Sequence, residues 1–125
     1  MTNHLMRVVN ISRRALLGDG ILTARTPQER SRGLLGTEKL PRGKGLWIVP
    51  CRGIHSFGMR YEFDALFIGH DGRVVGMHPG FRRNRISRIF WDAKGVLELP
   101  AGTIDRTFTA VGDEVVFQAA GGGAR

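Results

Sequence analysis

The fold is decided by the stretch Pro50-Cys-Arg-Gly-Ile-His-Ser-Phe-Gly-Met-Arg-Tyr-Glu-Phe-Asp-Ala-Leu-Phe67, in which a polar segment with two glycines leads into an apolar one. The stretch contains the single cysteine of the chain, Cys51, followed at intervals of four by His55 and Met59. Side chains repeat every two residues along a strand and about every four along a helix, so these three share one side of either element. The apolar run at residues 61–68 predicts a strand that is buried on both faces.

The composition indicates one globular domain. A chain of 125 residues, of which 42% are hydrophobic, buries about two-thirds of its unfolded surface and needs no disulfide or metal to fold. A single cysteine excludes an internal disulfide and suits a reducing compartment. Residues 12–17 resemble a twin-arginine export signal, but Gly18-Asp19-Gly20 interrupts the apolar segment that such a signal needs. We therefore expect a cytoplasmic protein. The sequence does not determine its oligomeric state.

The pattern of apolar residues is typical of short strands joined by turns. Gly18-Asp19-Gly20 and Asp71-Gly72 each predict a hairpin turn, because glycine tolerates positive φ. Strands are predicted at residues 5–11, 15–17, 21–24, 46–49, 61–68, 73–77, 95–99 and 114–118. The predicted core consists of Trp47, Phe57, Phe63, Leu66, Phe67, Val74, Val96, Leu97, Leu99, Val115 and Phe117.

One helix start is clear. Thr26 is placed to cap it, Pro27 fits its first position, and Glu29 completes a capping box. This helix is predicted to end at about Leu35. Together the elements indicate a mainly β, α+β fold, a compact single domain of short strands with barrel-like closure and one short helix. We place the domain at residues 1–118 and a disordered glycine-rich tail at residues 119–125.

A basic segment follows the predicted hairpin. Residues 78–94 show no helical or strand period, and a loop of this length is typically a binding segment. No acidic residue lies between Asp71 and Asp92, whereas the segment contains Arg82, Arg83, Arg85 and Arg88. With a net charge of +8, these arginines favour an anionic ligand or an acidic surface as partner.

Aromatic residues alternate with these arginines, as in surfaces that bind single-stranded nucleic acid. The same pattern fits a solvated loop that Phe90 and Trp91 anchor to the core. No recognised nucleic-acid-binding motif accompanies the charge, so we favour the solvated loop and keep a nucleic-acid-binding accessory protein as an alternative.

The ordered set of short motifs resembles that of a family of uncharacterised small proteins, domain of unknown function 192. The matching pieces are residues Arg30–Gly36, Gly45–Trp47, Ile54–Arg60, Asp64–Phe67, Asp71–Val75, Leu97–Gly102 and Gly112–Asp113. The resemblance covers most of the chain and implies a compact β-rich fold with little helix. It carries no established activity, so it implies no catalytic residues, and the sequence leaves the cofactor unknown.

Three carboxylates, Asp64, Glu98 and Asp113, border the predicted strands. A buried carboxylate is costly unless it is hydrogen-bonded or paired, so we expect each to have a partner. For Asp113, beside Gly112, we predict a role in a turn. For Asp64 and Glu98 two interpretations stay open, a structural partner or a cleft shared with His55.

We therefore predict a candidate ligand site that contains Cys51, His55, Met59, Asp64 and Glu98. It would be shallow, built from the segment around His55 and covered by the basic loop at residues 82–88, with an anionic ligand. The alternative from another class is a thiol- or metal-dependent enzyme using Cys51, His55 and Asp64. Cys51, His55 and Met59 suit Cu(I) by ligand type, but cysteine and methionine are also ordinary core residues. We assign no metal.

Overall fold

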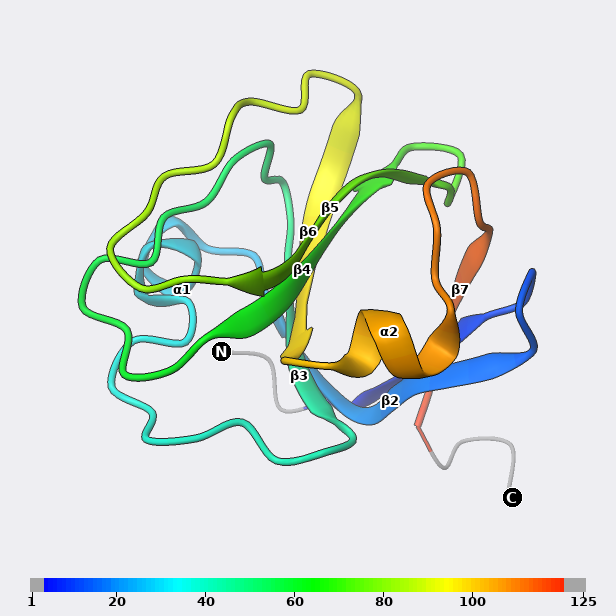
Figure 1. Ribbon diagram of the computed structural model, residues 1–125, viewed down its shortest axis with the longest axis horizontal. Coiled ribbons are helices and arrows are strands. Elements are labelled where there is room, and N and C mark those ends of the chain that lie inside the picture. The colour runs from blue at the N-terminus through cyan, green and yellow to red at the C-terminus, as the bar shows by residue number, and fades with distance from the viewer. Residues whose placement is uncertain (1–3, 121–125) are drawn as a thin grey trace.

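The computed structural model describes residues 4–120, and in them seven strands form one strongly curled sheet (Figure 1). The strands are β1 (Met6–Asn10), β2 (Ala15–Ala24), β3 (Lys44–Ile48), β4 (Phe63–Gly69), β5 (Val74–Phe81), β6 (Ala93–Pro100) and β7 (Val115–Ala119), and the helices are α1 (Pro27–Arg32) and α2 (Thr103–Thr107). Their order in the sheet is β5-β4-β6-β3-β2-β1-β7. Neighbouring strands are antiparallel except β2 and β3, which are parallel. The predicted mainly β, barrel-like single domain is confirmed.

The two ends of the sheet meet along part of their length. The turn before β5 hydrogen-bonds the segment that enters β7, through Val74 N to Asp113 O at 2.9 Å and Val115 N to Gly72 O at 2.8 Å. A bridge between Arg73 and Glu114 lies between these bonds. The curled sheet is therefore a half-barrel that closes at one end, which is the bent arrangement visible in Figure 1.

Side chains are buried on both faces of the central strands. The inner core, inside the curl, contains Leu66 and Ile68 of β4 with Leu97 and Leu99 of β6. The outer core covers the opposite face of the same strands and contains Phe63, Ala65, Phe67 and Val96. All seven residues of β4 are buried, as the continuous apolar run predicted.

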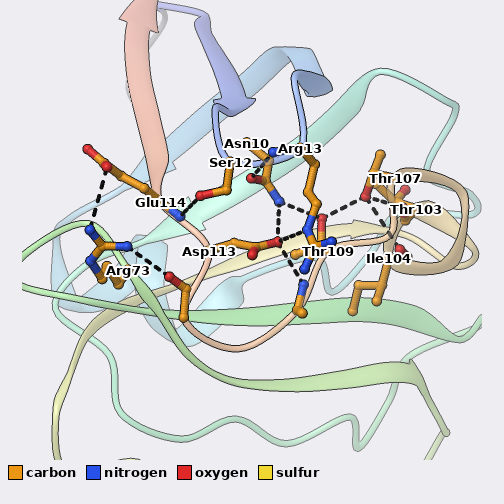
Figure 2. A network of polar contacts seen from close by, with 12 residues as sticks. Asn10, Ser12, Arg13, Arg73, Thr103, Ile104, Thr107, Thr109, Asp113 and Glu114 are labelled. Carbon is orange, nitrogen blue, oxygen red and sulfur yellow. Dashed lines mark hydrogen bonds and ion pairs between the residues drawn. The ribbon is translucent and has the colours of Figure 1, made fainter.

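A polar network links the turn after β1 to the segment before β7 (Figure 2). The Asp113 carboxylate accepts hydrogen bonds from the Asn10 amide, Arg13 Nε and Ala110 N, each at 2.9 Å. The Asn10 amide also donates to Thr109 Oγ1 at 3.0 Å. Burial by itself raises the pKa of Asp113, but the hydrogen bonds from Arg13 and Asn10 outweigh it and hold the pKa at about 2. Asp113 thus has a structural role close to the predicted one.

The predicted hairpin at Gly18-Asp19-Gly20 is wrong, because β2 runs through it without a turn. The carbonyl of Gly43 instead accepts hydrogen bonds from Asp19 N at 3.1 Å and Gly20 N at 2.8 Å. A Cβ atom at Gly18 would lie 2.9 Å from the Gly43 carbonyl oxygen. These glycines therefore allow the backbone of β2 to approach that of Gly43 closely. In the sequence, glycines needed for such an approach look the same as glycines needed for a turn.

The helices also differ from the prediction. The capping box is present, with Glu29 N donating to Thr26 Oγ1, but α1 ends at Arg32 and Gly33 forms its C-terminal cap. Helix α2 was not predicted, since its N-cap is Gly102 and no local side chain caps it. Within residues 4–120, neither helix is long and apolar enough to cross a bilayer. The predicted tail at 119–125 starts too early, because Ala119 belongs to β7 and Ala120 N donates to Leu5 O at 3.0 Å. From position 121 on it lies outside the described residues.

Two predicted core or anchoring aromatics lie at the surface. Phe57 is 47% exposed and Trp91 is 72% exposed, so both predictions are wrong. Of the two aromatic residues predicted to anchor the loop, Phe90 does so: its ring stacks on Phe67 with centroids 4.2 Å apart. A Cβ atom at Gly76 would lie 2.1 Å from the Phe90 ring, so this glycine makes room for the anchor.

His78 of β5 lies among the rings of Phe67, Phe81 and Phe90. Its Nε2 is buried and has no hydrogen-bond partner within the described chain. Burial and, to a lesser extent, the Arg88 guanidinium lower its pKa. The ring is therefore neutral at physiological pH and acts as a packing element of the outer core.

We expect Phe67→Ala to lower the free energy of unfolding by about 3–5 kcal/mol, because the Phe67 ring is fully buried between β4 and the Phe90 anchor. Phe57→Ala is the matched control, and its half-exposed ring should contribute within about 0.5 kcal/mol. Urea denaturation of both variants measures the difference. Equal losses in the two variants would contradict the burial of β4 on both faces.

Candidate functional site

Two long loops lie side by side and hold each other in place; we call residues 51–58 and 82–90 the loop pair. Ser56 N donates to Arg85 O, Ser87 N to Ile54 O at 2.9 Å each, and Phe90 N to Arg52 O at 2.8 Å. The buried Ser56 hydroxyl bonds the Arg82 carbonyl, and Ile54 N donates to Ser87 Oγ at 2.9 Å. Backbone hydrogen bonds along the pair therefore fix the segment in which the site was predicted.

A cavity of about 540 Å³ lies between this segment, the region of α1 and the outer face of β3 and β6. Its walls combine polar side chains with the apolar ones of Leu34, Leu35, Ile48, Ile54, Met59 and Phe63. Four of the five predicted ligand-site residues line it: Cys51, His55, Met59 and Glu98. The structure thus gathers side chains that are up to 47 positions apart in the sequence, from Cys51 to Glu98, around one cavity.

Glu98 is the unusual member of this set. It is only 4% exposed, and strand alternation in β6 turns it to the outer face while Leu97 and Leu99 face inward. Within residues 4–120, no hydrogen-bond donor or cation contacts its carboxyl group. Burial raises its pKa to about 8, so the group is largely protonated at neutral pH.

The cysteine and the histidine line the cavity without joining each other. The Cys51 thiol donates to Gly53 O at 3.1 Å, and His55 Nδ1 accepts from Phe57 N at 3.2 Å. Burial raises the pKa of the Cys51 thiol, and the backbone contact with Gly53 and the more distant Arg30 charge offset this only in part, so the sulfur is protonated at neutral pH. A nucleophilic cysteine needs the opposite shift and a base in hydrogen-bond contact.

The described residues contain no group of three or more His, Cys, Asp or Glu side chains that could hold a metal ion. Met59 is buried in the outer core, whereas His55 is exposed. The three soft ligands that the spacing placed on one side therefore differ in depth, and each of them already has a hydrogen-bond partner or a packing role.

Asp64 lies away from the cavity and joins three elements. Its Oδ1 accepts from Gly80 N and its Oδ2 from Ile104 N, both at 2.8 Å. These bonds tie the end of β5 and the first turn of α2 to β4, and Asp64 supplies the cap that α2 lacks locally. Of the two interpretations left open for Asp64, its contacts are those of the structural one.

The four arginines of the basic loop do not line the cavity. The basic loop instead forms hydrogen bonds with residues 52–56. The cavity, which the arginine loop was predicted to cover, is covered by α1 and the residues after it. Arg83 Nε donates to Met59 O at 2.8 Å, and the Arg88 guanidinium lies 4.0 Å from the centre of the Phe90 ring. Among the described residues, no carboxylate lies within 4 Å of Arg82, Arg83, Arg85 or Arg88.

Sequence reasoning missed the basic side of the cavity. Arg30 and Arg32 of α1 and Arg52 of the loop pair line it. Arg30 Nη1 donates to Pro50 O at 3.4 Å, which fixes α1 beside the segment that begins with Cys51. The capping box did locate α1, but the parallel pairing of β2 with β3 that brings it to the cavity leaves no local sequence signal.

We expect Asp64→Ala to lower the free energy of unfolding by about 2–4 kcal/mol, because it strands the buried N–H of Ile104 and the part-buried N–H of Gly80. Asp92→Ala is the control, since Asp92 is exposed and should contribute within about 0.5 kcal/mol. Denaturant unfolding measures both. An unaffected Asp64→Ala protein would show that its contacts do not hold α2 and β5 together.

Glu98 should make the fold less stable as pH rises. Its folded pKa of about 8 exceeds the ordinary 4.5, so between these values the folded protein keeps a proton that the unfolded chain has lost. The free energy of unfolding then falls by up to about 1.4 kcal/mol per pH unit in this window. We expect Glu98→Gln to remove this dependence on pH. The free energy of unfolding of the variant, relative to that of the natural chain, should therefore increase from about pH 5 to 8.

Urea denaturation across that range measures the difference, and Glu38→Gln is the control because Glu38 is exposed. A Glu98→Gln effect that does not change with pH would show that the Glu98 carboxyl ionises normally.

Comparison with known proteins identifies the family. No curated protein matches the chain. A protein of unknown function from Novosphingobium aromaticivorans has the same fold, with a TM-score of 0.77 and 22% identity over 90% of this chain and 83% of its own. So does a protein from Sinorhizobium meliloti described as a "putative transcription regulator", with a TM-score of 0.76 and 24% identity over 91% of this chain and 92% of its own. At these identities the likeness shows the fold alone.

The model of family DUF192, described as "Uncharacterized ACR", matches residues 17–117, and the chain therefore belongs to this family of unknown function.

Proposed function

We propose that the protein is a ligand-binding domain, and that the cavity above Glu98 holds a small organic molecule with an anionic group. The observation that carries the proposal is a carboxyl group that is 4% exposed and lacks a protein partner within the described chain. Asp64 and Asp113 are also buried, yet each accepts at least two hydrogen bonds. A largely buried acid without a protein partner is costly to keep. The unpaired Nε2 of His78 lies among phenylalanine rings, whereas Glu98 lines a cavity, and this placement supports a role for Glu98 toward a ligand.

The charge around the cavity favours an anion. Arg30, Arg32 and Arg52 line it, and none of them has a carboxylate within 4 Å in residues 4–120. Glu98 does not oppose an anion at neutral pH, because its raised pKa keeps it largely protonated. A protonated carboxyl can also donate a hydrogen bond to an acceptor oxygen of the ligand.

The remaining walls favour an apolar body on the ligand. A volume of about 540 Å³ lies in the range of small-molecule sites, and such sites combine apolar walls with a few polar groups. A second hollow of about the same volume, lined in part by Leu22, Leu40 and Leu46, contains no buried acid. It therefore serves as an internal comparison for the cavity.

We expect 4-phenylbutyrate to bind in the cavity and 4-phenylbutanol to bind about tenfold more weakly, because the alcohol lacks the charge that the arginines would pair with. Binding of the acid should weaken above about pH 8, where Glu98 ionises. The Met59 methyl group lines the cavity, so its NMR resonance should shift during the titration.

Two substitutions locate the binding. Leu35→Trp should fill the cavity above Glu98 and abolish the Met59 shift, whereas Leu40→Trp fills only the second hollow and should leave it unchanged. Both leucines are half-buried, so the two variants are matched in cost to the fold. An unshifted Met59 methyl at millimolar acid, or equal loss in both variants, would contradict the proposal.

A further inference from the structure

A second surface lies on residues 82–91, outside the cavity. Large apolar side chains are exposed within six residues there: Ile86 is 71% exposed, Ile89 43% and Trp91 72%. Arg82 and Arg85 are exposed in the same loop. We call these five residues the basic ridge. Single exposed apolar residues are ordinary, but three in one short loop beside unpaired cations indicate an interaction surface.

The ridge is held in place by the fold. The Ser87 and Phe90 backbone amides donate into the neighbouring loop, and the Phe90 ring is buried against Phe67. Ile89 and Trp91 flank this anchor and remain at the surface. The apolar side chains are therefore exposed on a loop whose conformation is fixed by hydrogen bonds and by the Phe90 ring.

The charge of the ridge lacks compensation within the described chain. No carboxylate lies within 4 Å of Arg82 or Arg85, and Arg85 Nη1 bonds only the neighbouring Asn84 carbonyl. Arg83 is fixed to Met59 O, so it belongs to the scaffold rather than to the ridge. The exposed cations favour an anionic partner, and the exposed apolar side chains favour one that also offers an apolar layer.

We propose that the basic ridge docks on a lipid bilayer that carries acidic phospholipids. Arginine is attracted to the anionic headgroups, tryptophan favours the boundary between headgroups and acyl chains, and isoleucine gains by leaving water there. Single-stranded nucleic acid fits the ridge less well, because bases stack on aromatic rings and two of its three apolar side chains are aliphatic. The nearby Phe57 ring already stacks with His55, with centroids 5.6 Å apart.

Sedimentation with vesicles tests this proposal, which is independent of the proposed cavity ligand. We expect the protein to bind vesicles of phosphatidylcholine mixed with phosphatidylglycerol, and to bind phosphatidylcholine alone far more weakly. Arg82→Gln with Arg85→Gln should lower the partition coefficient about 25-fold, since each arginine near an acidic surface contributes about fivefold. Ile86→Ser with Trp91→Ser should lower it at least tenfold through lost apolar burial.

The chain offers matched controls far from the ridge in sequence. Arg42→Gln with Arg106→Gln removes two exposed charges, and Phe108→Ser removes a ring that is 76% exposed. Neither control should change the partition coefficient more than about twofold. Because Trp47 is only 6% exposed, a blue shift of tryptophan emission on vesicle binding reports entry of Trp91 into the bilayer.

Three results would overturn the proposal. The first is equal loss in the ridge and control variants, which would indicate adsorption through net charge. The second is vesicle binding with unchanged Trp91 emission, which would leave the apolar side chains without a role. The third is no vesicle binding at all, whether or not the protein binds an oligothymidylate probe. Unchanged thermal unfolding of all the variants shows that any loss of binding arises at the surface.

Discussion

Burial of β4 and β6 on both faces is the constraint on which the rest of the structure depends. The curled sheet covers their inner face with its own strands, but their outer face would meet water without additional cover. In this protein the cover consists mainly of loops, with one short helix. Loops carry backbone groups that must be hydrogen-bonded, and the loop pair meets this need by bonding to itself through Ser56, Ser87 and the backbone around them.

Three buried carboxylates show how this fold separates structure from function. Asp113 and Asp64 each bind several donors, and each joins segments that are distant in sequence. Glu98 lies in the covered outer layer with no such donor in the described chain, at the edge of a cavity with basic and apolar walls. The fold satisfies two of its buried acids from within and leaves the third facing a cavity, and from this contrast we infer an external partner for Glu98.

Local sequence signals predicted the elements whose causes are local. The apolar run of β4, the capping box of α1 and the Asp71-Gly72 turn all appear where expected. Signals that depend on a distant partner were misread. The glycines of β2 make room for Gly43, and α2 takes its cap from Asp64, so neither could be recognised from its own neighbourhood. Phe57 and Trp91 look like core residues by type, and only the placement of the loop pair puts them at the surface.

In the candidate site, too, local features could be predicted from the sequence and contacts with distant residues could not. Strand periodicity placed Cys51, His55 and Met59 together, and they do line one cavity. It could not show that the thiol and the imidazole have separate partners, or that α1 brings Arg30 beside them. At the centre of the site, Glu98 is a protonated acid held without a protein partner in residues 4–120. A carbon-13 NMR titration of the Glu98 side-chain carboxyl measures this directly. The structure predicts a midpoint near pH 8, and a midpoint at or below the ordinary 4.5 would contradict it.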